Sequence, residues 1–294
     1  MSHRDFQALA RPYIVRDGRR FHLKDFDPRG PGRHRADDGA KKFLKKSVQA
    51  LSELQEKLYA QDQWSLLLIL QAMDAAGKDS AIEHVMSGVN PQGCDVHAFK
   101  SPSAEELDHD FLWRSSVRLP RRGHLGIFNR SYYEEVLVVR VHKEMLERQQ
   151  LPHSLITKNI WHERYEDIVT YERHLARNGT AIRKVFLHVS RGEQRRRFLA
   201  RLDEPDKRWK FALGDVAERK LWADYMHAYE AMIKATHTPF APWYIVPADR
   251  KWWARAVISA IITQALGELK LEYPRMSEER QRELMRVRRA LQRD

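Results

Sequence analysis

The stretch "LLLILQAMDAAGKDS", residues 66–80, runs from a block of leucines into a small-residue turn that ends in Gly77 and Lys78. A strand followed by such a turn and then by a helix is the context of a phosphate-binding (Walker A) loop. Two positions depart from the usual pattern of Gly, four residues, Gly-Lys and then Ser or Thr. Ala72 stands at the first glycine position, and Asp79 follows the lysine. These departures raise the question of which phosphate the loop binds.

The loop has the features that bring backbone N–H groups to an anion. Three successive positions carry small side chains or none: Ala75, Ala76 and Gly77. The following helix, "DSAIEHVMSG", adds the positive end of its dipole, and Lys78 adds a point charge. The alternative is an ordinary strand-to-helix turn with a surface lysine.

Two carboxylates and a hydroxyl make this loop unusual. Ser80 or Asp79 is expected to hold Mg²⁺, directly or through water, in place of the usual hydroxyl ligand. Asp74 lies inside the loop, where a carboxylate repels phosphate unless a metal or a transferring group needs it. Asp74 therefore points to chemistry beyond simple phosphate binding.

Short apolar segments alternate with longer amphipathic ones along the chain. The strand-like segments are "SLLLIL" (65–70), "DVHAFK" (95–100), "HLGIFN" (124–129), "KVFLHVS" (184–190) and "WYIVPA" (243–248). Strands separated by helices form parallel sheets, because each connection must cross back over the sheet. The sequence predicts an α/β fold with a doubly wound, parallel, five-stranded sheet, whose ligands bind beyond the carboxyl ends of the strands.

A second cluster of polar residues follows the third predicted strand, in "PRRGHLGIFNRSYYEEVLVVRVH". Phosphate-binding folds normally place an acid there to orient Mg²⁺. In this chain the strand ends in Asn129 and Arg130, with Glu134 one turn further on. We expect Arg130 to lie beside the phosphate loop; the alternative is a strand end with a solvent-exposed arginine.

A third cluster, "SRGEQRRRFLARLDEPDKRWKFALGD" (190–215), is strongly basic. Nucleotide kinases close basic lids over phosphates, which excludes water and delivers arginines to the developing charge. The segment predicts a helical lid whose cations are Arg191, Arg195, Arg196, Arg197, Arg201, Lys207, Arg208 and Lys210. The alternative is a solvated basic helix.

Composition limits the class of partner. The 294 residues carry 52 Lys and Arg against 40 Asp and Glu, a formal net charge of +12, which favours polyanionic partners. The single cysteine, Cys94, excludes an intrachain disulfide and fits a reducing compartment. The apolar runs are too short to span a bilayer, so the chain is expected in the cytoplasm without a membrane partner.

Basic flanks lie outside the predicted sheet. Residues 1–37 are rich in Arg, Pro and Gly and predict an extended basic arm, and residues 271–294 predict a charged helix. Both flanks are expected to be solvated or to contact other copies in a dimer or tetramer. Residues 38–270 are then the P-loop domain, with its lid at about 190–215.

Four segments together resemble the family-2 polyphosphate kinases: "DAAGKDSAIEHVMSGVNPQGC", "GIFNRSYYEEVLVVRVH", "SRGEQRRRFLARLDEPDKRWKF" and "APWYIVPADRKWWAR". Asn-Arg-Ser after the third strand, in place of Asp-Arg-Ser, resembles the class III branch. The resemblance implies a P-loop kinase-like fold with a helical lid and dependence on Mg²⁺, with Mn²⁺ as an alternative metal. It also implies reversible phosphoryl transfer between inorganic polyphosphate and adenine nucleotides, with AMP and ADP as acceptors.

The resemblance also assigns residues by position. Asp74, Gly77 and Lys78 belong to the phosphate loop, with Asp74 holding metal or orienting the acceptor phosphate. Asn129 and Arg130 form the second motif, with Glu134 on the acceptor side, and Arg191 with the basic residues after it forms the lid. The neutral Asn129 departs from the acid of other branches and leaves the second metal ligand open.

Two other functions fit parts of the pattern. An ATP-dependent nucleotide kinase would share the loop and the lid but not all four segments. A nucleic-acid-binding protein would use the arginine-rich flanks, but no recognition motif for DNA or RNA is visible, so no nucleic-acid partner is expected.

Overall fold

The computed structural model describes residues 3–31 and 37–293. Its centre is a five-stranded sheet in the order β2-β3-β1-β4-β5, with every neighbouring pair parallel. The strands are β1 (Ser65–Gln71), β2 (Cys94–Ala98), β3 (Leu125–Asn129), β4 (Thr180–His188) and β5 (Trp243–Pro247). The α/β fold with a doubly wound parallel sheet is therefore confirmed.

The central strand β1 shows why this sequence forms such a sheet. All seven of its residues are buried, as expected for a strand with neighbours on both sides and helices on both faces. Its register pairs Leu70 with Asn129 of β3 and with Val185 of β4. The strand therefore ends, and the phosphate loop begins, beside the end of β3.

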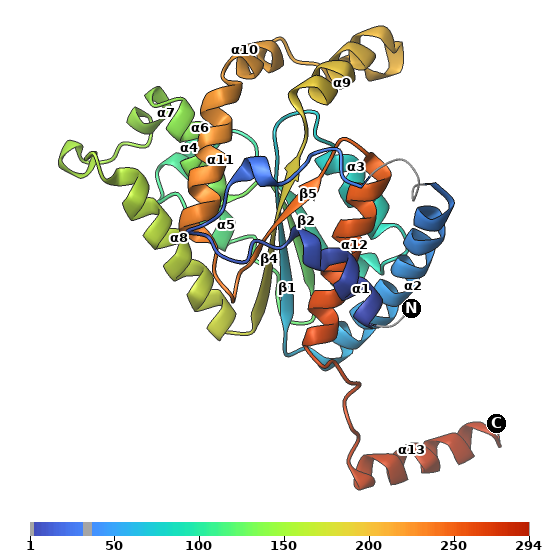
Figure 1. The fold of residues 1–294 in the computed structure, drawn as a ribbon. Helices are drawn as coiled ribbons and strands as arrows, with labels where there is room; N and C mark the ends of the chain where they lie inside the picture. Colours follow the sequence, from blue (N-terminus) through green and yellow to red (C-terminus); the bar gives the residue numbers. More distant parts are fainter. Residues whose placement is uncertain (1–2, 32–36, 294) are drawn as a thin grey trace.

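Helices cover both faces of the sheet (Figure 1). One face carries α1 (His3–Ala10), α2 (Asp37–Gln61), α3 (Lys78–Met86) and α12 (Lys251–Glu268). The other carries α8 (Ile160–Arg177) and α11 (Trp222–Thr236). Short helices fill the connections: α4 (Ala104–Leu107), α5 (Trp113–Ser116), α6 (Val138–Val141) and α7 (Glu144–Glu147). None of the described helices is long and apolar enough to cross a membrane.

The N-terminal segment is not the extended arm that its composition predicted. Residues 3–10 form α1, and Phe6 and Ala10, one turn apart, are buried in the main core. Val15 N–H donates to Trp243 O (2.9 Å), which fixes the following stretch along β5. The error arose because numerous arginines and glycines masked a short apolar stripe. Residues 1–2 and 32–36 of the predicted arm lie outside the described residues.

The lid rises above the carboxyl ends of the strands (Figure 1). It comprises α9 (Arg191–Asp203), a 3₁₀ segment (Pro205–Lys210) and α10 (Gly214–Lys220). At the opposite end of the molecule, α13 (Glu278–Leu291) forms the predicted charged helix and extends away from the body (Figure 1). The lid is therefore held over the edge of the sheet where ligands bind in this architecture.

Candidate active site

A cleft of about 830 Å³ lies between the phosphate loop and the lid. The loop supplies one wall with every residue from Asp74 to Ser80. The ends of β2 and β3 supply the base, including Lys100, Asn129 and Arg130. The lid and the start of α12 complete it with Arg196, Arg197, Ala200, Arg201, Glu204, Lys207, Trp209, Lys210, Asp215 and Lys251. The structure therefore brings the three predicted clusters around one cavity.

The phosphate loop has a left-handed backbone at two positions. Gly77 caps α3 with φ of +103°, a conformation that glycine adopts without a Cβ clash. Ala75 has φ of +60°, which costs an alanine roughly 1–2 kcal/mol. Such strain persists only where surrounding contacts enforce it, and it is concentrated at functional sites.

Lys78 opens α3 and is not the surface lysine of the alternative interpretation. Its side chain is partly buried, and its Nζ donates to Ala72 O at 2.9 Å. Burial lowers the pKa of the Lys78 ammonium, while the charge of Asp74 acts in the opposite direction. The cation is therefore held at the base of the loop.

The loop and the second motif are joined by charge. Arg130 Nη2 donates to Asp74 Oδ1 at 3.0 Å, and Arg130 Nη1 lies 4.0 Å from Glu134 Oε2. Burial raises the pKa of the Glu134 carboxyl, whereas the charges of Arg130 and Lys78 lower it. Arg130 lies beside the loop as predicted. Glu134 stands behind Arg130 and does not line the cleft.

A second link runs from β3 to the start of α3. Asn129 Nδ2 donates to Asp79 Oδ1 at 2.6 Å, and the Ser80 hydroxyl donates to Gly77 O at 3.2 Å. A neutral amide at position 129 can donate to a carboxylate, whereas an ionised acid at this position would repel it. Asn129 stands where an acid was expected, and Asp79 stands where Ser or Thr usually follows the lysine. The two exceptions are linked, because the amide of one donates to the carboxylate of the other.

The carboxylates of the site suit a metal that is shared with substrate. No group of three or more His, Cys, Asp or Glu that could hold an ion occurs among the described residues. Mg²⁺ is commonly held by one or two carboxylates together with substrate phosphates and water. Asp74 and Asp79 both line the cleft and can supply that number of ligands. These residues therefore fit one divalent cation.

The lid cations divide into two sets. Those that line the cleft are Arg196, Arg197, Arg201, Lys207 and Lys210. Arg191, Arg195 and Arg208 do not line it, and Arg208 Nε instead donates to Leu202 O at 2.9 Å. Arg191 and Arg195, predicted to bind phosphate, lie one turn apart on an exposed face of α9 and are not in the cleft wall. Their placement differs from the prediction because residues four apart share one side of a helix, and this side faces solvent.

Sequence reasoning missed several residues of the cleft. Lys100 and Phe99 follow β2, and Lys251 opens α12. Burial lowers the pKa of Lys251, and the nearby Arg197 and Arg255 add to this effect. Lys251 follows the end of the fifth predicted strand, and the rule that ligands bind at carboxyl ends of strands could have identified it.

The one cysteine of the chain does not line the cleft. Cys94 begins β2 as a free, half-buried thiol, and burial raises its pKa to about 12. A thiol of this kind is a poor nucleophile because little of it is ionised.

The parallel sheet, the phosphate loop after its central strand and the basic lid define a P-loop kinase-like phosphotransferase. The chain belongs to the family described as Polyphosphate kinase 2 (PPK2), which matches residues 34–274. The family resemblance seen in the four segments is therefore confirmed.

Individual relatives are similar over most of their length. The chain is 52% identical over 250 residues to the ADP-polyphosphate phosphotransferase of Rhodopseudomonas palustris, covering 85% of this chain and 86% of the relative. It is 45% identical over 266 residues to the AMP/ADP-polyphosphate phosphotransferase of Meiothermus ruber, covering 89% and 94%. The crystal structure of polyphosphate kinase 2 from Arthrobacter aurescens TC1 superposes with a TM-score of 0.85 at 40% identity, covering 94% of this chain and 96% of that one.

Proposed function

We propose that this protein transfers the terminal phosphoryl group of inorganic polyphosphate to AMP and to ADP, forming ADP and ATP, in a reversible reaction. The observation that carries the proposal is the meeting of a phosphate loop and a basic lid around one cleft, in a chain of the polyphosphate kinase family. An ATP-dependent nucleotide kinase of the same fold and a nucleic-acid-binding protein are both less consistent with this family membership.

The charge of the cleft indicates which phosphoryl donor it binds. Basic side chains outnumber acidic ones in the cleft even without Arg197, whose N–H groups all bind protein oxygens: Lys78, Lys100, Arg130, Arg196, Arg201, Lys207, Lys210 and Lys251 against Asp74, Asp79, Glu204 and Asp215. A chain of identical phosphates has no sequence to read, so neutralisation of its charge is sufficient for binding. An elongated polyanion of variable length therefore fits this surface.

The reaction requires little covalent help from the protein. An ionised phosphate oxygen of AMP or ADP attacks the terminal phosphorus of polyphosphate. The new P–O bond forms as the terminal P–O–P bridge breaks, and the donor leaves one phosphate shorter. Because the attacking oxygen is already ionised, positioning and charge neutralisation are the main needs. Lys78, Arg130 and the loop N–H groups are placed to supply them.

The acceptor range follows from the charge at the end of β3. An acid beside the acceptor would repel each additional phosphate, whereas Asn129 is neutral and bonds to Asp79. An acceptor with one or two phosphates is therefore tolerated. The two relatives differ in this respect, since the name of one carries ADP alone and that of the other carries both nucleotides.

We further propose that the divalent metal is Mg²⁺, with Mn²⁺ as a substitute, bound by Asp74 and substrate phosphates. When bound, the metal neutralises charge on the transferring group. The cytoplasm is the proposed location, supported by the single unpaired Cys94. A dimer or tetramer is the proposed assembly.

The test supplies the purified protein with Mg²⁺, polyphosphate and AMP, without ATP, and separates nucleotides by chromatography over time. ADP should form first and ATP later, and ADP supplied alone should yield ATP. Lys78→Ala protein prepared in parallel controls for contaminating adenylate kinase. ADP without ATP would restrict the enzyme to AMP, and no product from polyphosphate would reject the proposal.

A further inference from the structure

Arg197 uses every N–H group of its guanidinium within the protein. Its Nε donates to Glu193 Oε1 (2.7 Å). Its Nη1 donates to Ala75 O (3.0 Å) and Ala76 O (2.6 Å), and its Nη2 donates to Ala248 O (2.6 Å) and Asp249 O (3.2 Å). A guanidinium has five N–H donors. All five N–H groups therefore bind oxygen atoms of the protein, although the sequence predicts Arg197 to be a lid cation that meets phosphate.

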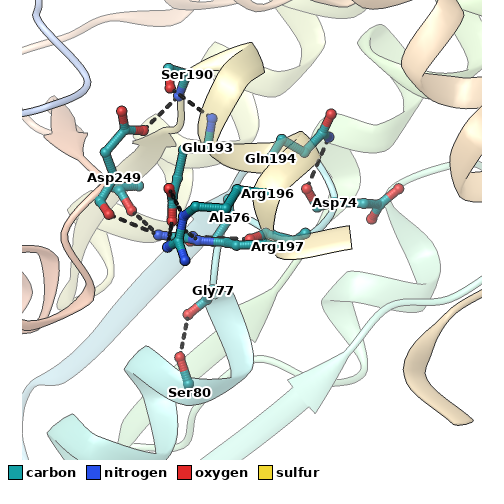
Figure 2. A network of polar contacts seen from close by, with 12 residues as sticks. Asp74, Ala76, Gly77, Ser80, Ser190, Glu193, Gln194, Arg196, Arg197 and Asp249 are labelled. Atoms are coloured by element: carbon teal, nitrogen blue, oxygen red, sulfur yellow. Dashed lines mark hydrogen bonds and ion pairs between the residues drawn. The ribbon is translucent and has the colours of Figure 1, made fainter. Parts of the chain in front are cut away.

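Gln194 makes a similar contact one helical turn earlier. This side chain is buried, and its Nε2 donates to Asp74 O at 3.0 Å. Together, Gln194 and Arg197 bind three consecutive carbonyls of the phosphate loop, at residues 74, 75 and 76 (Figure 2).

These hydrogen bonds also fix the direction of the neighbouring peptide N–H groups. In a planar trans peptide, the C=O of one residue and the N–H of the next point in opposite directions. Binding the carbonyls of residues 74–76 therefore fixes the direction of the N–H groups of Ala75, Ala76 and Gly77. Two of these residues, Ala75 and Gly77, have the left-handed φ angles of the loop. The contacts therefore act at the two left-handed positions of the loop, of which Ala75 is strained.

The side chains of Gln194 and Arg197, which together form a clamp on the loop, are anchored just after the end of β5. Asp249 Oδ1 accepts from Ser190 N–H at 2.7 Å, and the Ser190 hydroxyl oxygen accepts from Glu193 N–H at 3.1 Å (Figure 2). Glu193 in turn holds the Arg197 guanidinium. The first turns of α9 are therefore joined to the end of β5 and to the loop as one unit.

We propose that Arg197 and Gln194 are positioning residues that hold the phosphate loop in its phosphate-binding conformation, and that Arg197 is not a ligand of polyphosphate. Its charge is partly offset by Glu193, which also pairs with Arg196, and its guanidinium has no N–H donor left for substrate. The catalytic part of the proposal rests on the proposed function of the loop, whereas the structural part does not.

Arg197→Lys tests the proposal because it keeps the charge and removes the planar fork of donors. We expect kcat to fall about 100-fold, as for a displaced catalytic group. The Kd for polyphosphate of one defined length, and its salt dependence, should stay within twofold of wild type. Free guanidinium added to an Arg197→Ala protein should restore part of kcat. Gln194→Met, nearly isosteric, should lower kcat about tenfold with the same unchanged Kd.

Hydrogen exchange provides a readout that does not depend on activity. Amides of residues 72–80 should exchange about tenfold faster in Arg197→Lys and Gln194→Met than in wild type. Arg164→Lys is the matched control, because Arg164 is a buried clamp whose donors reach Glu135 and Gln149 instead of the loop. It should leave the exchange of 72–80 unchanged even if its melting temperature falls.

Normal kcat in Arg197→Lys, or unchanged exchange at 72–80 in both clamp variants, would overturn the proposal. So would a weaker polyphosphate Kd with a reduced salt dependence, which would make Arg197 a ligand. A wild-type protein that forms no ADP from polyphosphate would instead reject the proposed function, and the exchange measurement would still decide whether the clamp holds the loop.

Discussion

Asp74 and Arg130 form a 3.0 Å ion pair between the phosphate loop and the end of β3, although 56 positions separate them in the chain. Each side chain is about one third exposed, so both can be reached from the cleft. The pair places a carboxylate that can hold a metal beside a guanidinium that can hold a phosphoryl oxygen. Opposite charges kept this close can act on one transferring group without waiting for a conformational change.

Removing the loop cation should abolish turnover. We expect Lys78→Ala to lower kcat at least 100-fold, because its single charge lies at the base of the loop. Lys78→Met keeps the partly buried stem and should lose as much activity with less effect on stability. Nucleotide chromatography and thermal melting test both variants. Activity within twofold of wild type, with an unchanged melting temperature, would exclude Lys78 from the mechanism.

Neutralising the loop acid should impair metal use. Asp74→Asn keeps the size of the side chain but weakens both metal binding and the pair with Arg130. We expect kcat to fall about 100-fold and half-maximal activity to require more Mg²⁺. A titration of Mg²⁺ at saturating polyphosphate measures this. An unchanged Mg²⁺ requirement would show that Asp74 does not hold the metal.

The two sets of lid cations should behave differently. Lys207→Gln with Lys210→Gln removes two cations of the cleft wall. The slope of log affinity for polyphosphate against log salt should become shallower by roughly 0.7 per lost contact, the value for single-stranded polyanions. Arg195→Gln, on the exposed face of α9, should keep the wild-type slope. The reverse order of effects would place polyphosphate on the outer face of the lid.

His142 should stabilise the base of the lid at low pH. Its Nε2 lies 3.0 Å from Glu218 of α10, and its Nδ1 lies 3.2 Å from Glu144. Burial lowers the pKa of His142, but the bonds to Glu218 and Glu144 outweigh this and raise it above the ordinary value. The stabilisation is therefore complete below the unfolded-state pKa and is lost as pH rises through the raised folded-state pKa.

Urea unfolding of His142→Gln tests this sign. The variant should be less stable than wild type at about pH 6, and the difference should shrink by about pH 9. A difference that stays constant over this range would mean that the contribution of His142 comes from packing alone.

Much of the fold follows from the sequence because it depends on local patterns. Each of the five apolar segments became a strand, and the parallel order follows from the helices between them. The boundaries were less certain. Strand β4 begins at Thr180, not 184, because pairing with Ser65 of β1 extends it through the more polar residues 180–183. Pairing between strands fixes where a strand begins, and the hydrophobic periodicity of one segment carries no information about that pairing.

The sequence predicts the three clusters of the site, but it does not predict the role of each cation in the lid. Arg195, Arg196 and Arg197 are adjacent and chemically identical in the sequence. In the structure, Arg195 is exposed on α9 and Arg196 lines the cleft. Arg197 is buried against backbone carbonyls of the phosphate loop. The difference depends on the direction of each side chain around α9 and on which strand ends it meets. Composition predicts a basic lid, whereas three-dimensional packing decides which arginine meets substrate.

The most direct test of the central claim follows the phosphoryl group itself. Polyphosphate labelled with ³²P is incubated with unlabelled AMP, Mg²⁺ and the protein, with no ATP present. We expect label to appear first in the β-phosphate of ADP and then in the γ-phosphate of ATP, and we expect Lys78→Ala to form neither. Label that remains in polyphosphate, when a second sample with ATP added does phosphorylate AMP, would contradict this, because the donor would then be a nucleotide.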